Sequence, residues 1–313
     1  MKISKKNIAK PFLKWAGGKT QLIEQIEKQF PQTLKNTPFT YIEPFVGSGA
    51  VLFWILEHYP NINRAIINDI NTDLTNTYDS IKFDVERLIN ILSIWEFEYH
   101  SISENEEKKK EYYYNKRSLF NLRSSNQTTQ SALFIFLNRT CFNGLYRVNK
   151  NNEFNVPIGS YKKPQICNKE NLLAVAEILQ GVEILNGDFA ETLKYANANS
   201  FFYFDPPYKP LNQTSSFNSY SKNEFDDTEQ IRLKEFCEIL EEQGHQWILS
   251  NSDVKGKDPH NNFFDDLYSS FNIFRVNARR NINANPEKRG ELTELLISNI
   301  AYPHEPEFKY GLR

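Results

Sequence analysis

Asp205, Pro206, Pro207 and Tyr208 are residues whose types and spacing suggest chemistry, and they follow an aromatic run, SFFYF. Two successive prolines fix the backbone and remove two N–H donors, so the Asp205 carboxylate and the Pro206 carbonyl remain as acceptors. An exocyclic amino group is a donor that suits two such acceptors, and the Tyr208 ring offers a face for stacking a base. The string favours a site for an amino-bearing base; the alternative is a rigid turn capped by Asp205.

A second candidate is the string FVGSGA at residues 45–50, which contains Gly47 and Gly49. A glycine-containing loop between a strand and a helix lets the backbone approach a ligand and presents N–H groups at the helix N-terminus. Asp69 ends the next expected strand, roughly 20 residues further on, where an acid can accept hydrogen bonds from ribose hydroxyls. The pair favours an adenosine-containing cofactor; the alternatives are a plain tight turn and a helix-capping Asp69.

The third candidate is the string KWAGGK at residues 14–19, with Trp15 and Lys19. An indole face attracts a cation and an ammonium pairs with a carboxylate, so these residues suit a ligand with a sulfonium and a carboxylate. Gly17, Gly18 and Lys19 also look like half a phosphate loop, but the spaced first glycine and a preceding strand are missing. Together the three strings point to a methyltransferase that uses S-adenosylmethionine on a nucleobase amino group.

The elements that must position these residues alternate between strand and helix. We expect a strand at residues 41–43, a loop at 45–49 and then a helix through Tyr59; a second strand ends at Asp69, and a helical stripe covers 72–92. Later strands end near Asp188, at Asp205 and near Asn251. This order is typical of a nucleotide-binding α/β sheet. We expect a catalytic domain in residues 1–76 and 170–313, interrupted by a mainly helical domain at 77–169.

The distribution of charge suggests a role for the expected inserted domain at residues 77–169. The chain has 313 residues, 40% of them hydrophobic, and a net charge of −2. Residues 112–167 nevertheless carry eight basic side chains against the single acid Glu153, and residues 272–290 carry five against one. Such runs are often solvated faces, but a basic insertion in an α/β domain also suits a module that grips phosphates.

The composition excludes several classes of protein. A chain this long and this apolar can bury a sizeable core, which excludes disorder as its main state. Its three cysteines, Cys141, Cys167 and Cys237, are too scattered for a disulfide framework or a zinc site, so we expect a reducing, cytoplasmic setting and no metal. The longest apolar run, residues 50–56, is too short to span a membrane.

The ordered strings resemble the Dam-type, alpha-class family of adenine-N6 DNA methyltransferases over nearly the whole chain. The matching strings are KWAGGK, EPFVGSGAVLF, NDIN, the long segment 138–164, GDF, YFDPPY and LSNSD. The resemblance implies a Rossmann-like S-adenosylmethionine-dependent methyltransferase sheet with an inserted target-recognition domain. Where close relatives often read GRYKKP, this chain has Ser160 in GSYKKP.

The resemblance also implies roles for individual residues. The expected catalytic residues are Asp205, Pro206, Pro207 and Tyr208. The expected cofactor-binding residues are Trp15, Lys19, Phe45, Gly47, Gly49, Asp69, Asp188, Phe189 and Asp205. The expected DNA-binding residues are Lys14, Arg139, Phe142, Asn143, Leu145, Arg147 and Pro157, of which Phe142 would wedge into the duplex.

The implied reaction is direct methyl transfer to a flipped adenine in a short duplex site, with GATC as the expected site. The implied partners are double-stranded DNA and S-adenosylmethionine. We expect a monomer or a weak dimer, working in the cytoplasm of a prokaryotic or phage-infected cell, in some relatives beside a restriction enzyme. Two alternatives stay open: an RNA or cytosine-N4 methyltransferase, and a DNA-binding protein that kept the fold without catalysis.

Overall fold

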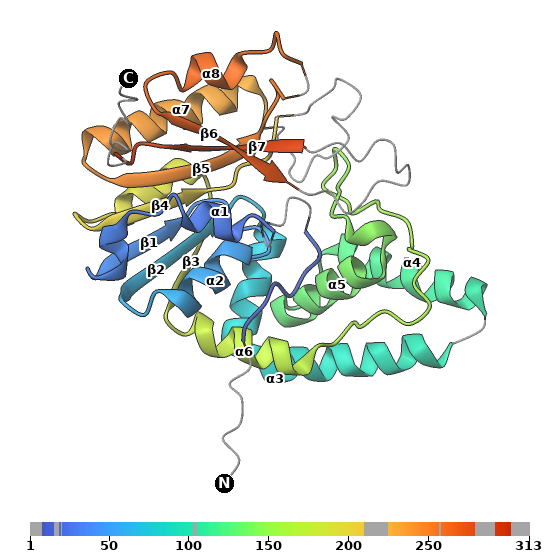
Figure 1. Ribbon diagram of the computed structural model, residues 1–313. Helices are drawn as coiled ribbons and strands as arrows, with labels where there is room; N and C mark the ends of the chain where they lie inside the picture. Colours follow the sequence, from blue (N-terminus) through green and yellow to red (C-terminus); the bar gives the residue numbers. More distant parts are fainter. Residues whose placement is uncertain are drawn as a thin grey trace, which may run out of the picture.

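The computed structural model describes residues 8–15, 19, 21–102, 105–209, 225–256, 258–278 and 292–301. Within these residues a seven-stranded sheet has the order β3-β2-β1-β4-β5-β7-β6 (Figure 1). The strands are β1 (Phe39–Glu43), β2 (Ile62–Asp69), β3 (Val182–Asn186), β4 (Ser200–Phe204), β5 (Gln246–Ser252), β6 (Asn272–Ala278) and β7 (Leu292–Ser298). Strands β1 to β5 are parallel, and β7 runs antiparallel to β5 and β6. The α/β sheet expected from the sequence is confirmed.

The central strands are buried and mostly apolar because both faces of the sheet are covered. Every residue of β1 and of β4 is buried. Along β4, Phe201 and Tyr203 join one core cluster, and Phe202 and Phe204 join the other. Side chains alternate between faces with a period of two, so an uninterrupted apolar run is what a strand between two helical layers requires.

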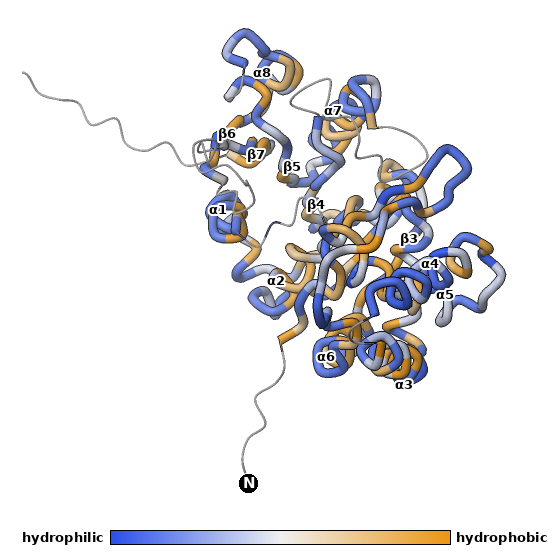
Figure 2. The backbone as a smooth tube through the Cα atoms, turned by 90° about the vertical axis from the view of Figure 1, so that its right-hand side faces the viewer, coloured by the Kyte–Doolittle hydropathy of each residue, from blue (hydrophilic) through white to orange (hydrophobic). Residues whose placement is uncertain are grey.

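The helices cover the sheet and extend beyond it to one side. They are α1 (Ile23–Glu27), η1 (Gln32–Lys35), α2 (Ala50–His58), α3 (Thr72–Ser101), α4 (Glu106–Leu122), α5 (Gln127–Thr140), η2 (Phe142–Gly144), α6 (Lys169–Leu179), η3 (Phe189–Tyr195), α7 (Asp227–Glu242) and α8 (Phe263–Leu267). Helices α3, α4, α5 and α6 each begin after an asparagine whose side chain accepts a first-turn N–H. Figure 2 shows apolar and polar residues alternating along outer helices such as α3 and α7.

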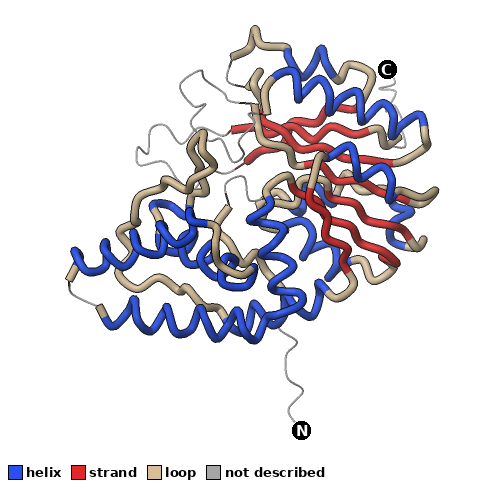
Figure 3. Tube along the Cα trace, turned by 180° about the vertical axis from the view of Figure 1, so that it is seen from behind, coloured by secondary structure: helices blue, strands red, loops and turns tan. Residues whose placement is uncertain are grey.

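Helices α3, α4 and α5 form a helical layer beside the sheet (Figures 1 and 3). Helix α3 packs against α5 and α6 and also touches β2 and β3. The expected domain boundary at residue 77 falls inside α3, which is interrupted by a kink at Asp84 and runs from the sheet into the helical layer. The division of the chain into two domains stays a prediction.

Two findings concern what the described part of the chain lacks. No helix in it is both long enough and apolar enough to cross a membrane. Among the described residues, no three His, Cys, Asp or Glu side chains gather in a way that could hold a metal ion.

Candidate functional site

The candidate site lies where the loops after β1 and β4 meet. These two strands are neighbours in the middle of the sheet, and the connections on either side of them run in opposite directions along the strand order. Ligands of open α/β sheets bind at the carboxyl ends of the strands at such a reversal. The sequence strings at residues 45–50 and 204–208 are therefore brought to one edge.

The loop after β1 is shaped by its glycines. Gly49 precedes α2 with φ of 76°, and a Cβ atom there would lie 2.7 Å from the Tyr78 hydroxyl. Gly47 has φ of 49°, and a Cβ atom there would lie 3.1 Å from the Trp15 ring. Both positions need a left-handed backbone and close approach, which glycine alone adopts at low cost. Gly47 and Trp15 thus form a narrow cradle.

Asp69 faces that loop from the end of β2. Its carboxylate accepts the Gly47 N–H at 3.1 Å through Oδ2 and the Asn71 N–H at 2.9 Å through Oδ1. Burial raises the pKa of Asp69 to about 6, and the two backbone N–H groups oppose this rise. A carboxylate held in this way can accept ribose hydroxyls, as the sequence predicts.

Trp15 lies between the loop after β1 and Tyr146 in the segment expected to read DNA. Its ring stacks on Tyr146, with centroids 5.9 Å apart and an interplanar angle of 23°. Its edge contacts Phe134 of α5. The Tyr146 hydroxyl donates to Asp73 at 2.8 Å, which fixes the stacked ring. One aromatic stack therefore joins the cofactor string to the segment expected to read DNA.

Phe45, in the loop after β1, contacts a second aromatic residue, Phe189. The rings of Phe45 and Phe189 are 5.3 Å apart, so two residues expected to border the cofactor adenine do meet. Asp188 next to them is bound by both terminal nitrogens of Arg232, at 2.9 and 2.6 Å. The hydrogen bonds from Arg232 lower the pKa of Asp188. Arg232 also lies 4.1 Å over the Phe189 ring.

The catalytic string is tied together by a buried ammonium group. Lys19 is 2% exposed, and its Nζ lies 3.0 Å from Asp205 Oδ1 and 3.5 Å from Glu294 Oε2. It also donates to the Tyr208 hydroxyl, which in turn donates to Glu294 at 2.5 Å. The residue type predicts that Lys19 pairs with a carboxylate of the ligand; in this structure the ammonium pairs with two carboxylates of the protein, Asp205 and Glu294.

The surrounding groups shift the pKa of the Asp205 carboxyl. Burial raises its pKa to about 6, with a further rise from Glu294, while Lys19 lowers it. The pKa of Tyr208 is raised well above its ordinary value by burial and by the nearby carboxylates. Asp205 is therefore ionised at neutral pH, and Tyr208 keeps its proton.

The two prolines form a rigid turn held from α7. Pro206 is buried and Pro207 is exposed. The Pro207 carbonyl accepts from Gln230 Nε2 at 3.1 Å, and Gln230 Oε1 accepts from Asn251 at 3.0 Å. Since Gln230 and Asn251 are fully buried, the direction of the turn is set by α7 and β5 together.

The segment expected to read DNA is a hairpin, residues 142–157, that follows α5. Isolated bridges pair Val148 with Phe154 and Cys141 with Ile158. Its buried side chains are Tyr146, Val148, Phe154 and Val156. The alternate side chains, those expected to touch bases, are exposed or half-buried: Leu145, Arg147 and Pro157. Phe142 is 50% exposed, and Asn143 beside it has φ of 54°. Phe142 and Pro157 are therefore exposed, whereas Leu145 packs partly against the core.

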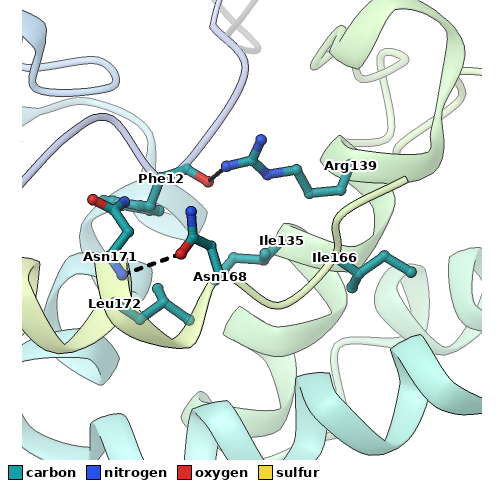
Figure 4. Close-up of a pocket in the computed structure, with 7 residues that line it drawn as sticks. All are labelled: Phe12, Ile135, Arg139, Ile166, Asn168, Asn171 and Leu172. Atoms are coloured by element: carbon teal, nitrogen blue, oxygen red, sulfur yellow. Dashed lines mark hydrogen bonds between the residues drawn. The ribbon is translucent and has the colours of Figure 1, made fainter. Parts of the chain in front are cut away.

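A short ladder of side chains holds the extended segment before Trp15. Asn171 of α6 bonds both backbone groups of Lys10, and Asn138 of α5 bonds both backbone groups of Lys14. Between them the Arg139 guanidinium donates to the Phe12 carbonyl at 2.6 Å, beside the small pocket of Figure 4. Burial lowers the pKa of Arg139. In this structure Arg139 holds the chain, and its expected contact with DNA stays a prediction.

Asn138 also reaches the hairpin. Its Nδ2 donates to the Gly144 carbonyl at 2.9 Å as well as to Lys14, and the side chain is 1% exposed. A Cβ atom on Gly144 would lie 2.5 Å from the Lys14 side chain. Lys14 and the turn at residues 142–145 are thus fixed against each other by one buried amide.

Sequence reasoning missed four residues of this site: Glu43, Asn138, Tyr146 and Glu294. Glu43 is fully buried at the end of β1, accepts from Tyr41 at 2.7 Å, and has a pKa raised well above its ordinary value, chiefly by burial. A single acid inside an apolar strand was the available signal for Glu43 and for Glu294. Asn138 and Tyr146 lie inside a matching string but carried no local signal.

The second basic cluster is only partly visible in the structure. Arg275 in β6 binds Asp253 and Asp265, so its charge is balanced within the protein. The other basic residues of that cluster, Arg279, Arg280, Lys288 and Arg289, lie outside the described residues, as do Gly17 and Gly18 of the first string.

Comparison with known proteins gives a consistent set of relatives. A family model described as D12 class N6 adenine-specific DNA methyltransferase matches residues 15–282. Type II methyltransferase M.MjaIII of Methanocaldococcus jannaschii is 51% identical over 93% of this chain and 99% of that protein. The DNA adenine methylase of Haemophilus influenzae is 38% identical over 92% of each chain. Type II methyltransferase M1.LlaDCHI of Lactococcus lactis subsp. cremoris is 36% identical over 93% of this chain and 95% of that protein.

Proposed function

The chain belongs to the D12 class N6 adenine-specific DNA methyltransferases, and we propose that Asp205, Pro206 and Tyr208 hold a flipped adenine for direct methyl transfer within a short duplex site, with GATC as the site to test first. The single observation that carries the catalytic assignment is the half-buried Asp205 carboxylate at the central edge of the sheet, which is joined to Tyr208 through the buried Lys19 ammonium. The match of both the family model and the relatives already makes the protein an adenine-N6 DNA methyltransferase.

The residues at the loop after β1 fit the family's cofactor, S-adenosylmethionine. The Gly47 cradle beside Trp15 admits a ligand close to the backbone, and Asp69 offers an acceptor for ribose hydroxyls. Phe45 and Phe189 supply apolar faces for an adenine ring. When bound, the cofactor supplies an electrophilic methyl group on a sulfonium, and the proposal needs no metal ion.

The contribution of Asp205 is to orient the target nitrogen. The adenine amino group is a poor nucleophile because its lone pair is delocalised into the ring. Two acceptors, the Asp205 carboxylate and the Pro206 carbonyl, favour a tetrahedral nitrogen that carries partial positive charge as the bond forms. The Tyr208 ring offers a stacking face that offsets part of the few kcal/mol spent on extruding the base. Fixed geometry then lowers the barrier without a covalent enzyme intermediate.

We assign recognition of the site to the outward face of the 142–157 hairpin. Phe142 would fill the gap left by the flipped base, Asn143 would lie beside it, and Leu145, Arg147 and Pro157 would contact base edges. Lys14 is held next to the same turn through Asn138. We further propose a monomer that works on double-stranded DNA in the cytoplasm, with no fixed requirement for a partner restriction enzyme.

The test is sequencing with detection of modified bases on DNA from cells that express the protein, with an Asp205→Ala variant as control. The expected result is N6-methyladenine at one short palindrome, absent in the variant, while the purified variant still binds duplex DNA. Methylation by the variant would remove Asp205 from the mechanism. A single site other than GATC would correct the target alone and leave the reaction unchanged.

A further inference from the structure

Glu294 is the one acid in the described part of β7, and it points into the catalytic cluster from across the sheet. Strand β7 is separated from β4 by β5, yet Glu294 Oε2 reaches both the Tyr208 hydroxyl, at 2.5 Å, and Lys19 Nζ, at 3.5 Å. The side chain is 22% exposed. Nothing in the chemistry of cofactor binding or base stacking requires an acid at this place.

The charges of the cluster explain what the acid does there. Without Glu294, the buried Lys19 ammonium would neutralise Asp205, with which it makes a 3.0 Å salt bridge. With Glu294 present, one cation faces two carboxylates, so Asp205 keeps negative charge to offer to a donor. Among the described residues, Tyr41, Glu43 and Tyr203 also lie close enough to interact with the charge of Asp205. Burial raises the pKa of each, which favours its uncharged form.

The contact between Glu294 and Tyr208 affects the orientation of the Tyr208 ring. The Tyr208 hydroxyl donates to it, and the ring of Tyr208 lies 4.2 Å from the Lys19 ammonium. Because a phenolic O–H bond lies in the plane of its ring, donation to a fixed carboxylate favours one ring plane. A stacking face needs such a fixed plane before the base arrives.

We propose that Glu294 is a positioning residue for methyl transfer: it offsets the charge of Lys19, which leaves Asp205 a stronger acceptor for the adenine amino group, and it fixes the plane of Tyr208. The inference rests on the catalytic role proposed for Asp205. It assigns the acid a task that neither binding the cofactor nor binding DNA includes.

The experiment is the single-turnover rate of methyl transfer in a preformed enzyme–DNA complex, measured from pH 5 to 8.5 for Glu294→Gln. Glutamine keeps the size of the side chain and removes its charge. We expect the rate to fall by roughly tenfold to a hundredfold, the effect of a misplaced reacting group, while the Kd for S-adenosylmethionine stays unchanged. Because Glu294 raises the pKa of Asp205, the acidic limb of the profile should move to lower pH.

The matched control is Glu183→Gln, which removes a strand acid that is ion-paired with Arg64 at the far edge of the sheet. It should leave the rate and the profile unchanged. A wild-type rate for Glu294→Gln, or a slow rate with an unmoved acidic limb, would overturn the proposal.

A third variant keeps the test decisive if Glu294→Gln does not fold. Glu294→Asp keeps the charge but draws it back from the Tyr208 hydroxyl, so we expect a slower rate with the acidic limb in place; an unchanged rate would overturn the positioning role.

The Asp205→Ala variant separates the proposal on Glu294 from the proposed role of Asp205. If it is active, the role of Asp205 fails; if it is inactive while Glu294→Gln behaves as wild type, only the inference on Glu294 fails.

Discussion

The catalytic edge and the 142–157 hairpin use buried polar groups in opposite ways. At the catalytic edge, side chains are bound to one another: Lys19, Asp205, Tyr208 and Glu294 form one connected cluster. At the hairpin, the contacts that fix the turn are made to the backbone. The Asn138 side chain bonds the backbone of Lys14 and Gly144, and the Phe142 N–H donates to the Pro157 carbonyl at 2.9 Å. The side chains of Phe142 and Pro157 are exposed.

This difference fits the roles proposed for the two regions. Transfer of a methyl group needs the reacting side chains fixed before the substrate arrives, so they are locked by charge. Reading a base pair needs side chains that can exchange water for base edges, so only the chain that carries them is locked. Trp15 joins the hairpin to the sheet, because it stacks on Tyr146 and lies against Gly47 in the loop after β1.

The largest expected effect is on the catalytic edge, from Lys19→Met. Removing the ammonium leaves Asp205 and Glu294 without the cation that separates their charges. Lys19 lowers the pKa of Asp205, so the acidic limb of the methyl-transfer rate should move to higher pH, opposite to the shift expected for Glu294→Gln. We expect the single-turnover rate at neutral pH to fall roughly 10²–10³-fold, as when one preorganised electrostatic partner is removed.

Lys82→Met is the control for Lys19→Met. Lys82 on α3 donates to the Val182 carbonyl at 2.6 Å, away from the site, and its loss should leave the rate profile in place. If Lys19→Met and Glu294→Gln moved the acidic limb in the same direction, the two residues would not act on Asp205 through charge.

The next effect separates the hairpin from the catalytic edge through Asn138→Leu. Leucine fills the space but leaves three backbone groups of Lys14 and Gly144 without this partner, and each group that stays buried and unpaired lowers the free energy of unfolding by about 1–3 kcal/mol. Because the lost bonds fix Lys14 against the turn, discrimination between the correct site and single-base mismatches should also fall. Both are measured by denaturant unfolding and by competition kinetics on matched duplexes.

Asn171→Leu offers a control for Asn138→Leu, since Asn171 bonds both backbone groups of Lys10 in the same way but does not touch the hairpin. It should reduce stability with no change in discrimination. Equal losses of discrimination in the two variants would show that Asn138 acts through general stability, and the contrast between the regions would weaken.

A smaller effect is expected on the outward face of the hairpin itself, from Arg147→Ala. Arg147 Nε donates to Asn155 at 2.7 Å, which aims the guanidinium along the hairpin. If it reads a guanine through two hydrogen bonds, its loss should relax preference at one base pair by about 1–3 kcal/mol. Lys150→Ala at the exposed tip should instead weaken binding evenly across sequences. An even loss for Arg147→Ala would make it a phosphate contact.

The sequence predicted the parts of this molecule that local patterns determine. Strand β2 does end at Asp69, and β4 does end just before Asp205. Other limits were set by tertiary packing. The stripe expected to end at residue 92 continues to Ser101 because the layer with α4 and α5 also buries Tyr99. The sequence did not predict β6 and β7: strand β6 lies inside the basic cluster at residues 272–290, and β7 follows directly after it.

Within the site, the sequence predicted residues that lie inside one motif and not their partners elsewhere in the chain. Glu294 contacts residues 86 and 275 positions away, and Asn138 contacts Lys14 across 124 positions. Contacts over such separations depend on strand order and helix placement. No spacing rule within a string could have indicated them.

The smallest expected effect concerns cofactor affinity and pH at Asp69. The pKa of this carboxyl is raised to about 6 by burial, and the proposed site uses its ionised form to accept ribose hydroxyls. Bound cofactor then excludes the proton, so the Kd for S-adenosylmethionine should be constant above pH 6 and weaken below it, by at most about tenfold per pH unit for one proton. Titration calorimetry from pH 5 to 8 measures this slope.

Asp69→Asn should make the Kd independent of pH. Asp79→Asn, which removes an acid with a raised pKa on α3, should leave the pH dependence of the Kd unchanged. A slope that survives in Asp69→Asn would assign the proton to another group, with Asp205 as the next to test, because its pKa is also about 6.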